Sequence, residues 1–264
     1  MQNLKSKTQY PKSGSVVVVG LGPGDLAQLT PAARQALESA DIIYGYKTYL
    51  RLIGDLAPGT PREGSGMRQE VSRVNRVVDD AQAGKRVALV SSGDAGVYGM
   101  AGLVYEVLRE RAEANVAVEV IPGISALNAA AALLGAPLMT DFAAISLSDQ
   151  LTPRAEILRR VELAAQADFV LCLYNPKGKQ RVEPFELTCQ ILARHRSPDT
   201  PVGLVRAAYR AQQAVEVITL ADLPEAEVNM VTIVIVGNSR TGIYDGKMVT
   251  PRGYATKYDL DSSD

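Results

Sequence analysis

Three short loops rich in glycine hold most of the residues in this sequence that could bind a ligand. They are residues 20–25 (GLGPGD), 91–99 (SSGDAGVYG) and 122–126 (PGISA), and each follows a run rich in Val. Glycine lets a ligand approach the backbone closely, and open α/β sheets place ligands at the carboxyl ends of their strands. Asp94 could accept hydrogen bonds from ligand hydroxyl or ammonium groups, or it could only cap a helix, and Ser125 leaves the same alternatives.

The first of these loops does not fit a dinucleotide. The pattern G-x-G-x-x-G would need glycine at position 25, where the chain has Asp25, and this carboxylate would repel a pyrophosphate at the helix entrance. The expected second strand also lacks a terminal acidic residue, because it runs into Gly45, Tyr46 and Lys47. A nicotinamide-dependent reductase is therefore disfavoured, and a tight turn without any ligand stays open as the alternative.

A basic loop follows a later apolar run. Residues 174–181 (YNPKGKQR) place Lys177, Lys179 and Arg181 within five positions. Such charges usually belong to a solvated loop. Beside a cleft they would suit a substrate with several carboxylates, for which arginine offers two parallel hydrogen bonds.

The single histidine and the two cysteines are expected to take no part in chemistry. His195 lies at the end of an expected helix, where we predict a solvated side chain, and this excludes Ser-His-Asp and Cys-His hydrolases. Cys172 and Cys189 lack a neighbouring CxxC or His pair, which argues against structural zinc, an iron-sulfur cluster and a disulfide framework. We expect two reduced, buried thiols.

Composition indicates an α/β enzyme and excludes broad classes of partner. Of the 264 residues, 47% are hydrophobic, 22% are charged and none is Trp, so Val, Leu, Ile and Ala must fill the core, as in buried parallel sheets. A formal net charge of -1 provides no overall basic field for nucleic acid or an anionic membrane. No apolar run approaches the roughly 20 residues that cross a bilayer, and residues 1–14 form a polar, flexible leader without a signal region. We therefore expect a cytoplasmic protein that binds neither nucleic acid nor membrane.

The elements that must hold these loops alternate between strands and helices, as in βαβ units. The first half predicts strands at 15–21, 41–46, 86–92 and 116–123, with helices at 29–40, 67–83, 97–113 and, in an Ala-rich stretch, 123–138. Thr30 is the expected N-cap of the first helix, with Pro31 in its first turn. The second half predicts strands at 142–149, 168–176, 201–206, 214–220 and 230–236, helices at 153–166 and 184–196, and a hairpin around 244–247.

Domain boundaries follow from the change of pattern near residues 138–141. We predict an N-terminal domain at 15–138 with a mainly parallel sheet. A C-terminal domain at 139–264 should have a mixed sheet, because it has more strands per helix, and should end in a hairpin and tail.

Six segments in this order and spacing resemble the tetrapyrrole methyltransferase family over about residues 15–240. They are GLGPGD, SSGDAGVYGMAG, PGISALNAAAALLGAPL, DFAAISLSD, LYNP and VTIVIVGNS. Within that family, GYKTY, ISLSD followed by LTP, LYNP and the tail DGKMVTPRGY are similar to the precorrin-3B C17-methyltransferases, in particular to the cobalt-factor III branch.

The resemblance implies an α/β fold of two αβα domains, with S-adenosyl-L-methionine bound in the cleft between them, no protein-bound metal, and a homodimer. It implies C17 methylation and ring contraction of precorrin-3B or cobalt-factor III in cobalamin biosynthesis, any cobalt being carried by the substrate. Contacts to the methyl donor are expected from Pro23, Ser92, Gly93, Asp94, Val97, Ser125, Ala126, Asn175, Ala207 and Thr232. Contacts to the tetrapyrrole are expected from Gly22, Gly24, Lys177, Lys179 and Arg181.

Methyl transfer from a sulfonium mainly requires alignment of the reactants and exclusion of water. Ring contraction also requires a proton donor and acceptor, for which Asp25, Lys47, Tyr98 and Arg206 are the hypotheses. One departure concerns the strand of ISLSD, where relatives carry Cys or another functional side chain and this chain has alanine at 143 and 144. A methyltransferase for a different corrinoid position and a non-catalytic tetrapyrrole carrier stay open as alternatives, as does the presence of cobalt in the natural substrate.

Overall fold

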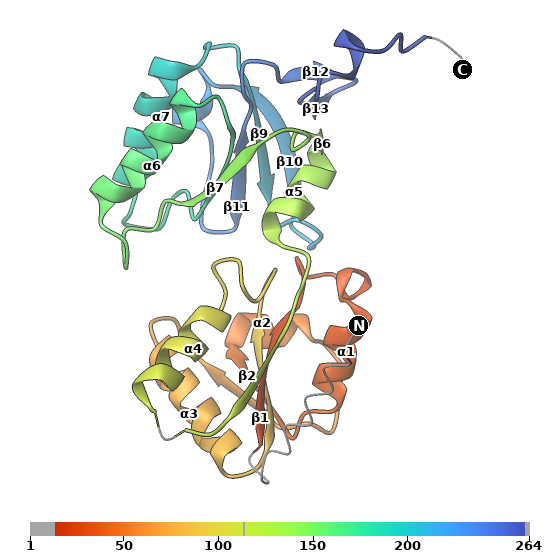
Figure 1. Ribbon diagram of the computed structural model, residues 1–264, viewed down its shortest axis with the longest axis vertical. Coiled ribbons are helices and arrows are strands. Elements are labelled where there is room, and N and C mark those ends of the chain that lie inside the picture. Colours follow the sequence, from red (N-terminus) through yellow and green to blue (C-terminus); the bar gives the residue numbers. More distant parts are fainter. Residues whose placement is uncertain (1–13, 113, 262–264) are drawn as a thin grey trace, which may run out of the picture. The chain divides into compact units, whose positions relative to one another are not determined.

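The computed structural model describes residues 14–112 and 114–261. Residues 1–13 of the expected leader and residue 113, at the end of an expected helix, lie outside the described residues. Gly14 is already part of the fold, because its amide donates to the Ala81 carbonyl at 2.9 Å. The chain divides into two compact units, Met1–Ser125 and Ala126–Asp264 (Figure 1).

The first unit contains a five-stranded sheet in which every strand pair is parallel, in the order β3-β2-β4-β1-β5. This confirms the parallel sheet expected from the sequence. Its strands are β1 (Ser15–Gly20), β2 (Ile42–Tyr46), β3 (Arg62–Ser65), β4 (Arg86–Ser91) and β5 (Ala117–Ile121). The edge strand β3 was not expected, because its sequence REGS carries no apolar run.

Helices cover both faces of this sheet (Figure 1). Val17 and Val19 of β1 pack on the side of α1 (Pro31–Glu38) and α2 (Lys47–Leu52), and Val16 and Val18 pack on the side of α3 (Glu70–Gln82) and α4 (Ala101–Glu110). The first helix begins as predicted, since the Thr30 hydroxyl accepts from the Ala33 amide at 3.1 Å. The last one begins at 101 instead of 97, because residues 93–100 form a tight loop.

The second unit contains a mixed sheet in the order β10-β9-β11-β8-β7. The β7–β8 pair is parallel and the other three pairs are antiparallel, as predicted. Helices α6 and α7 pack on one face and α5 packs on the other (Figure 1). The elements are α5 (Ala126–Leu134), β7 (Phe142–Ser146), α6 (Arg154–Gln166), β8 (Val170–Tyr174), α7 (Glu183–His195), β9 (Pro201–Arg206), β10 (Ala214–Thr219) and β11 (Thr232–Val236).

A short third sheet closes the second unit. It joins the hairpin of β12 (Gly242–Tyr244) and β13 (Lys247–Val249) to β6 (Gly135–Ala136), directly after α5. The hairpin turns at Asp245 and Gly246, which both have positive φ, as the predicted Asp-Gly turn requires. Three 3-10 helices complete the elements: η1 (Leu26–Gln28), η2 (Leu223–Glu225) and η3 (Tyr254–Thr256).

The division between the units differs from the expected boundary at 138/139 and lies at 125/126. Helix α5 contributes buried Leu127, Ala130, Ala131 and Leu134 to the core on one face of the second sheet, and β6 pairs with β13. The change of pattern near residue 138 therefore marks the end of a helix inside the second unit.

Candidate functional site

The three glycine loops of the first unit contact one another through their backbones. The Gly22 amide donates to the Gly93 carbonyl at 3.0 Å, and the Gly93 amide donates to the Gly22 carbonyl at 2.7 Å. A Cβ on Gly20 would lie 2.6 Å from the Gly123 nitrogen, and a Cβ on Gly123 would lie 2.3 Å from the Gly93 carbonyl oxygen. These glycines therefore allow the loops after β1, β4 and β5 to pack closely on each other.

Asp94 joins two of these loops. Its Oδ1 accepts from the amides of Gly96 and Val97 at 2.8 and 3.0 Å, and its Oδ2 accepts from the Gly123 amide at 3.0 Å. It does not cap a helix, since α4 begins seven residues later. A carboxylate has about four acceptor positions, so a ligand hydroxyl or ammonium group can still bind Oδ2 without breaking these contacts.

The rest of the loop after β4 is held in a strained shape. The Ser91 hydroxyl accepts from the Met100 amide at 3.1 Å, and the Ala101 amide donates to the Ala95 carbonyl at 3.0 Å. Between these contacts Tyr98 has φ +52° and is 55% exposed. Strained residues of this kind cluster at functional sites, and this one presents its side chain outward at the carboxyl end of the strand.

Arg73 of α3 was not expected at the site. It is 3% exposed; its Nε donates to the Ser65 hydroxyl at 2.6 Å, its Nη2 donates to the Gly66 carbonyl at 3.0 Å, and its Nη1 lies 3.8 Å from the Met100 sulfur. Burial lowers the pKa of Arg73. The guanidinium thus holds the loop after β3 beside the start of α4. The sequence did contain one indication of this role: Arg73 lies four residues before Val77, and this spacing places it on the buried face of the helix.

Three of the four proposed proton-transfer residues lie at one edge of the first sheet. Asp25, Lys47 and Tyr98 follow β1, β2 and β4, which are neighbouring parallel strands. The Asp25 carboxylate accepts from the Ala27 amide at 2.8 Å and caps η1. Arg206 belongs to the second unit, so neither unit by itself brings all four together.

The loop after β1 also lacks the geometry of a dinucleotide site. Helix α1 begins only at Pro31, so no α-helix N-terminus directly follows the glycines. Pro23 is buried, and Gly24 has φ +141°. This loop therefore has no α-helix N-terminus in position to receive the pyrophosphate of a dinucleotide.

The donor-binding residues expected in the second unit also lie at one edge of its sheet. Strands β8 and β9 end at this edge and β11 begins there, with Thr232 directly opposite Arg206. Asn175 and Ala207, the first residues after β8 and β9, have φ +51° and +47°.

The start of α5 lies beside the same edge. The Leu127 amide donates to the Tyr174 hydroxyl at 3.0 Å, which places Ala126 close to the end of β8. Tyr174 was not predicted as a site residue, and its position one residue before Asn175 was the available signal. The fold thus brings Ala126, Asn175, Ala207 and Thr232 to one region of the second unit.

Two polar side chains of this edge are engaged within the unit. The Asn175 Nδ2 donates to the Ser146 hydroxyl at 2.9 Å. The Thr232 hydroxyl is buried and donates to the Asn229 Oδ1 at 3.2 Å. These contacts fix both side chains at this edge of the sheet.

The basic loop is less free than the sequence suggested. Arg181 donates to the backbone carbonyls of Leu147 and Asn175 at 2.6 and 2.7 Å, and burial lowers its pKa. The Lys177 ammonium lies 4.6 Å from the centre of the Phe185 ring. The Arg181 guanidinium, which was expected to bind a substrate carboxylate, is therefore bound to backbone carbonyls of the protein itself. Lys179 is exposed, so it is the charged residue of this loop best placed to contact a substrate.

His195 is a correction to the sequence analysis. Its Nε2 contacts the Glu162 carboxylate, which also binds Arg194 at 2.5 Å. The hydrogen bond from His195 is the main cause that lowers the pKa of Glu162. The histidine is half-buried and paired, where a solvated side chain was predicted.

The cysteines agree with their prediction. Cys172 and Cys189 are free and buried and belong to the cores on opposite faces of the second sheet. Burial raises the pKa of each thiol to about 12. Neither is suited to act as a nucleophile.

In residues 14–112 and 114–261 no group of three or more His, Cys, Asp or Glu side chains is placed to hold a metal ion. None of the helices in these ranges has the length and apolar character that a membrane crossing requires.

Comparisons with known proteins agree with this architecture. Residues 15–224 match the family described as Tetrapyrrole (Corrin/Porphyrin) Methylases. The chain is 52% identical over 254 residues to the cobalt-factor III methyltransferase of Priestia megaterium, with 95% of the chain covered. It spans about half of that relative's length, 47%. It is 46% identical over 237 residues to the probable cobalt-factor III C(17)-methyltransferase of Salmonella typhimurium, with 90% of the chain and 98% of the relative covered.

Two solved structures extend the comparison. The crystal structure of the methyltransferase CobJ matches with a TM-score of 0.86 and 38% identity, covering 90% of this chain and 100% of that one. The uroporphyrin-III C-methyl transferase of Thermus thermophilus, complexed with S-adenyl homocysteine, matches with a TM-score of 0.67 and 26% identity, covering 85% and 97%.

Proposed function

Because this chain belongs to the tetrapyrrole (corrin/porphyrin) methylase family, we propose that it methylates C17 of a tetrapyrrole with S-adenosyl-L-methionine in cobalamin biosynthesis. The proposed substrate is cobalt-factor III or metal-free precorrin-3B, and the reaction includes ring contraction. The observation that carries the proposal is the packing of three glycine loops at one sheet edge, with Asp94 oriented by three backbone amides. The names of the two relatives support the substrate and the position.

The residues of both units fit the methyl donor, which supplies an activated methyl group on a sulfonium. In the first unit, the free acceptor position of Asp94 suits an ammonium or ribose hydroxyl group, and exposed Val97 offers apolar contact. In the second unit, the small side chains of Ala126 and Ala207 leave room for a ligand at their edge. The proposed donor contacts are Pro23, Ser92, Gly93, Asp94, Val97 and Ser125 of the first unit, and Ala126, Asn175, Ala207 and Thr232 of the second.

The protein's part in methyl transfer is to hold the reactants in line and exclude water. We propose that Gly22, Gly24, Lys177 and Lys179 contact the tetrapyrrole, with Lys179 the residue that meets a carboxylate. Arg181 supports this loop through its contacts to the backbone. For the protons of ring contraction, Asp25, Lys47 and Tyr98 share an edge of the first unit, and Arg206 of the second unit completes the set to be tested.

The test is product analysis with a labelled donor. The purified chain is incubated with S-adenosyl-L-methionine carrying a ¹³C-methyl group and, in parallel, with cobalt-factor III and precorrin-3B. We expect one added methyl by mass, a ¹³C signal at C17, and the spectrum of a contracted ring. A ¹³C signal at another carbon would establish a sister methyltransferase. Binding of both compounds without a mass change would establish a carrier.

We also propose that the enzyme works in the cytoplasm and as a homodimer, as its family resemblance implies. Light scattering coupled to size-exclusion chromatography measures the mass in solution. A mass of one chain at micromolar concentration would contradict the dimer.

A further inference from the structure

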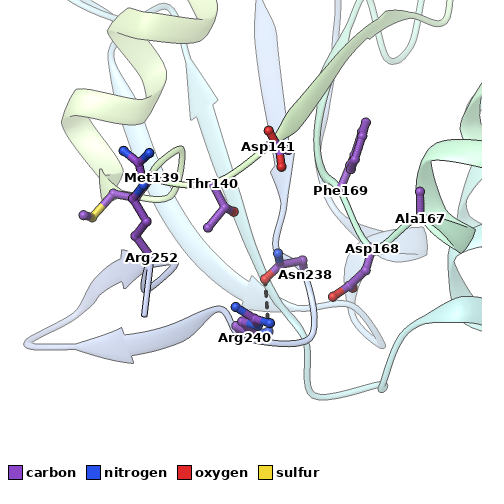
Figure 2. Close-up of a pocket in the computed structure, with 9 residues that line it drawn as sticks. All are labelled: Met139, Thr140, Asp141, Ala167, Asp168, Phe169, Asn238, Arg240 and Arg252. Atoms are coloured by element: carbon purple, nitrogen blue, oxygen red, sulfur yellow. Dashed lines mark hydrogen bonds between the residues drawn. The ribbon is translucent and has the colours of Figure 1, made fainter. Parts of the chain in front are cut away.

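A polar cavity of about 640 Å³ lies in the second unit, away from its expected donor-binding edge. Asp141 and Phe169 precede β7 and β8, and Asn238 follows β11, which runs antiparallel to β8. The cavity is therefore at the opposite edge of the sheet from Asn175. Figure 2 shows its lining: Met139, Thr140, Asp141, Ala167, Asp168, Phe169, Asn238, Arg240 and Arg252.

Hydrogen-bond donors without intramolecular partners gather in this cavity. Among the described residues, the guanidinium groups of Arg240 and Arg252 have neither an ion pair nor a hydrogen bond, and both residues are exposed. The buried hydroxyl oxygen of Thr140 also lacks a partner among these residues. Asn238 uses its Oδ1 to accept from the Arg240 amide at 3.0 Å, which leaves its Nδ2 amide group as a further donor.

The acidic residues of the lining do not cancel this excess of donors. Both Asp168 oxygens accept from Ser239, at 3.0 Å from its amide and 2.6 Å from its hydroxyl. Buried Arg196 lies 3.4 Å from the same carboxylate and balances its charge. The remaining charges are those of Arg240, Arg252 and Asp141, which sum to one positive charge.

We propose that this cavity binds a small oxyanion that also carries a hydroxyl group, such as a phosphate monoester. The two arginines and the amide of Asn238 would hold the anionic oxygens, since charge-assisted hydrogen bonds from arginine are the strong ones. Asp141 would accept from the hydroxyl of the ligand. Met139 and Phe169, both partly exposed at the cavity, would contact its carbon skeleton. This site is separate from methyl transfer, because none of its residues belongs to the proposed donor or tetrapyrrole contacts.

Inorganic phosphate is the probe, because its protonated forms carry both chemical features. Titration of the intact chain by isothermal calorimetry or ³¹P NMR should give saturable binding. Arg240→Met and Arg252→Met should each weaken it about tenfold or more, the effect of one charge-assisted hydrogen bond. Arg159→Met is the matched control: Arg159 is also exposed in the second unit and has no ion pair among the described residues. It should leave phosphate affinity unchanged.

Thr140→Val provides a second test, in which thermal stability and phosphate affinity should change in opposite directions. Valine removes a buried hydroxyl that has no partner, so the thermal midpoint without phosphate should rise. Phosphate affinity should fall several-fold, because the Thr140 hydroxyl would be a further donor to the anionic oxygens. A variant that simply misfolds would lower both quantities.

Three outcomes would overturn the proposal. The first is the absence of saturable phosphate binding by the unaltered chain. The second is an equal loss of affinity in Arg159→Met, which would indicate general attraction to positive charge. The third is unchanged phosphate affinity in both arginine variants. Each outcome can be read without any measurement of methyl transfer, so failure here and failure of the proposed function remain distinguishable.

Discussion

The two units hold their candidate ligand loops by different means. In the first unit the loops after β1, β4 and β5 pack backbone against backbone at Gly20, Gly22, Gly93 and Gly123, and Asp94 accepts from three amides. In the second unit the loops are held mainly by long side chains that reach backbone groups, above all Arg181 and Tyr174.

This difference predicts how each half responds to substitution. Close backbone packing leaves no space for a new atom, so even one methyl group in the first unit should be costly. A side-chain contact can be removed without a steric clash, so its loss costs only the hydrogen bonds and the packing of that side chain. The first unit should therefore be sensitive to additions, and the second to deletions.

The largest effect is expected from Gly123→Ala. Its Cβ would lie 2.3 Å from the Gly93 carbonyl oxygen, which cannot move without breaking the pairing with Gly22. We expect the free energy of unfolding to fall by about 3 kcal/mol, measured by urea denaturation. The control is Gly102→Ala at an exposed position of α4, where nothing lies within 4 Å of the added atom. This control should gain about 1 kcal/mol from helix propensity. Similar values for the two variants would contradict the close packing.

Asp94→Asn tests the carboxylate that joins the loops after β4 and β5 in the first unit. An amide group there presents N–H to backbone amides that need an acceptor, so we expect a loss of about 2 kcal/mol in stability. We also expect at least a tenfold weaker affinity for S-adenosyl-L-methionine by calorimetry. Asp25→Asn is the matched control, because among the described residues this carboxylate accepts from one amide, that of Ala27. The substitution should cost less than about 1 kcal/mol. Full donor affinity in Asp94→Asn would remove Asp94 from the proposed donor contacts.

Arg181→Met tests the second unit by deletion. It removes the hydrogen bonds to the carbonyls of Leu147 and Asn175 and should lower the free energy of unfolding by about 2 kcal/mol. Lys179→Met, in the same loop, should leave stability unchanged and raise the KM for the tetrapyrrole. The opposite result, an intact fold with a raised KM in Arg181→Met, would make Arg181 a substrate contact, as the sequence suggested.

Alkaline pH should destabilise the two units from different pH values, and this is the smallest of the expected effects. Burial raises the pKa of Cys172 and Cys189 in the second unit from 9.0 to about 12, and that of Tyr44 in the first unit from 10.0 to about 12. The folded state therefore keeps protons that the unfolded chain releases, and stability falls as pH rises above the unfolded value. The second unit should weaken from about pH 9 and the first from about pH 10. Hydrogen exchange followed by mass spectrometry at pH 8 to 10.5 measures the stability of each unit separately. In Cys172→Val, the stability of the second unit should fall less steeply with rising pH.

The sequence predicted well those features that depend on near neighbours. The buried strands were recognised from runs such as residues 16–19, the first helix from Thr30 and Pro31, and the final turn from Asp245 and Gly246. Each of these signals is local, because backbone geometry or burial is set by residues within a few positions. Strand β3 was not predicted, because its pairing with β2 depends on the rest of the sheet and not on its own composition.

In the candidate site, too, the sequence could not predict contacts between residues that are far apart in the chain. Asp94 and Arg181 were singled out from the sequence, but their partners Gly123 and Leu147 lie about 30 positions away along the chain. No spacing rule indicates such a contact. The roles of these residues therefore became clear only when the fold placed their partners, and Arg73 was found for the same reason.

The short sheet of β6, β12 and β13 has a consequence for how this chain is made on the ribosome. Met248 is fully buried, and its sulfur together with Leu134 fills the space above Gly203. Proteins are synthesised from the N-terminus and fold domain by domain. The first unit can close once residue 125 has left the exit tunnel, whereas the second must wait for residues near 249 before the end of α5 is covered. Translation speed through residues 126–249 thus sets how long that apolar surface stays open to chaperones and to aggregation.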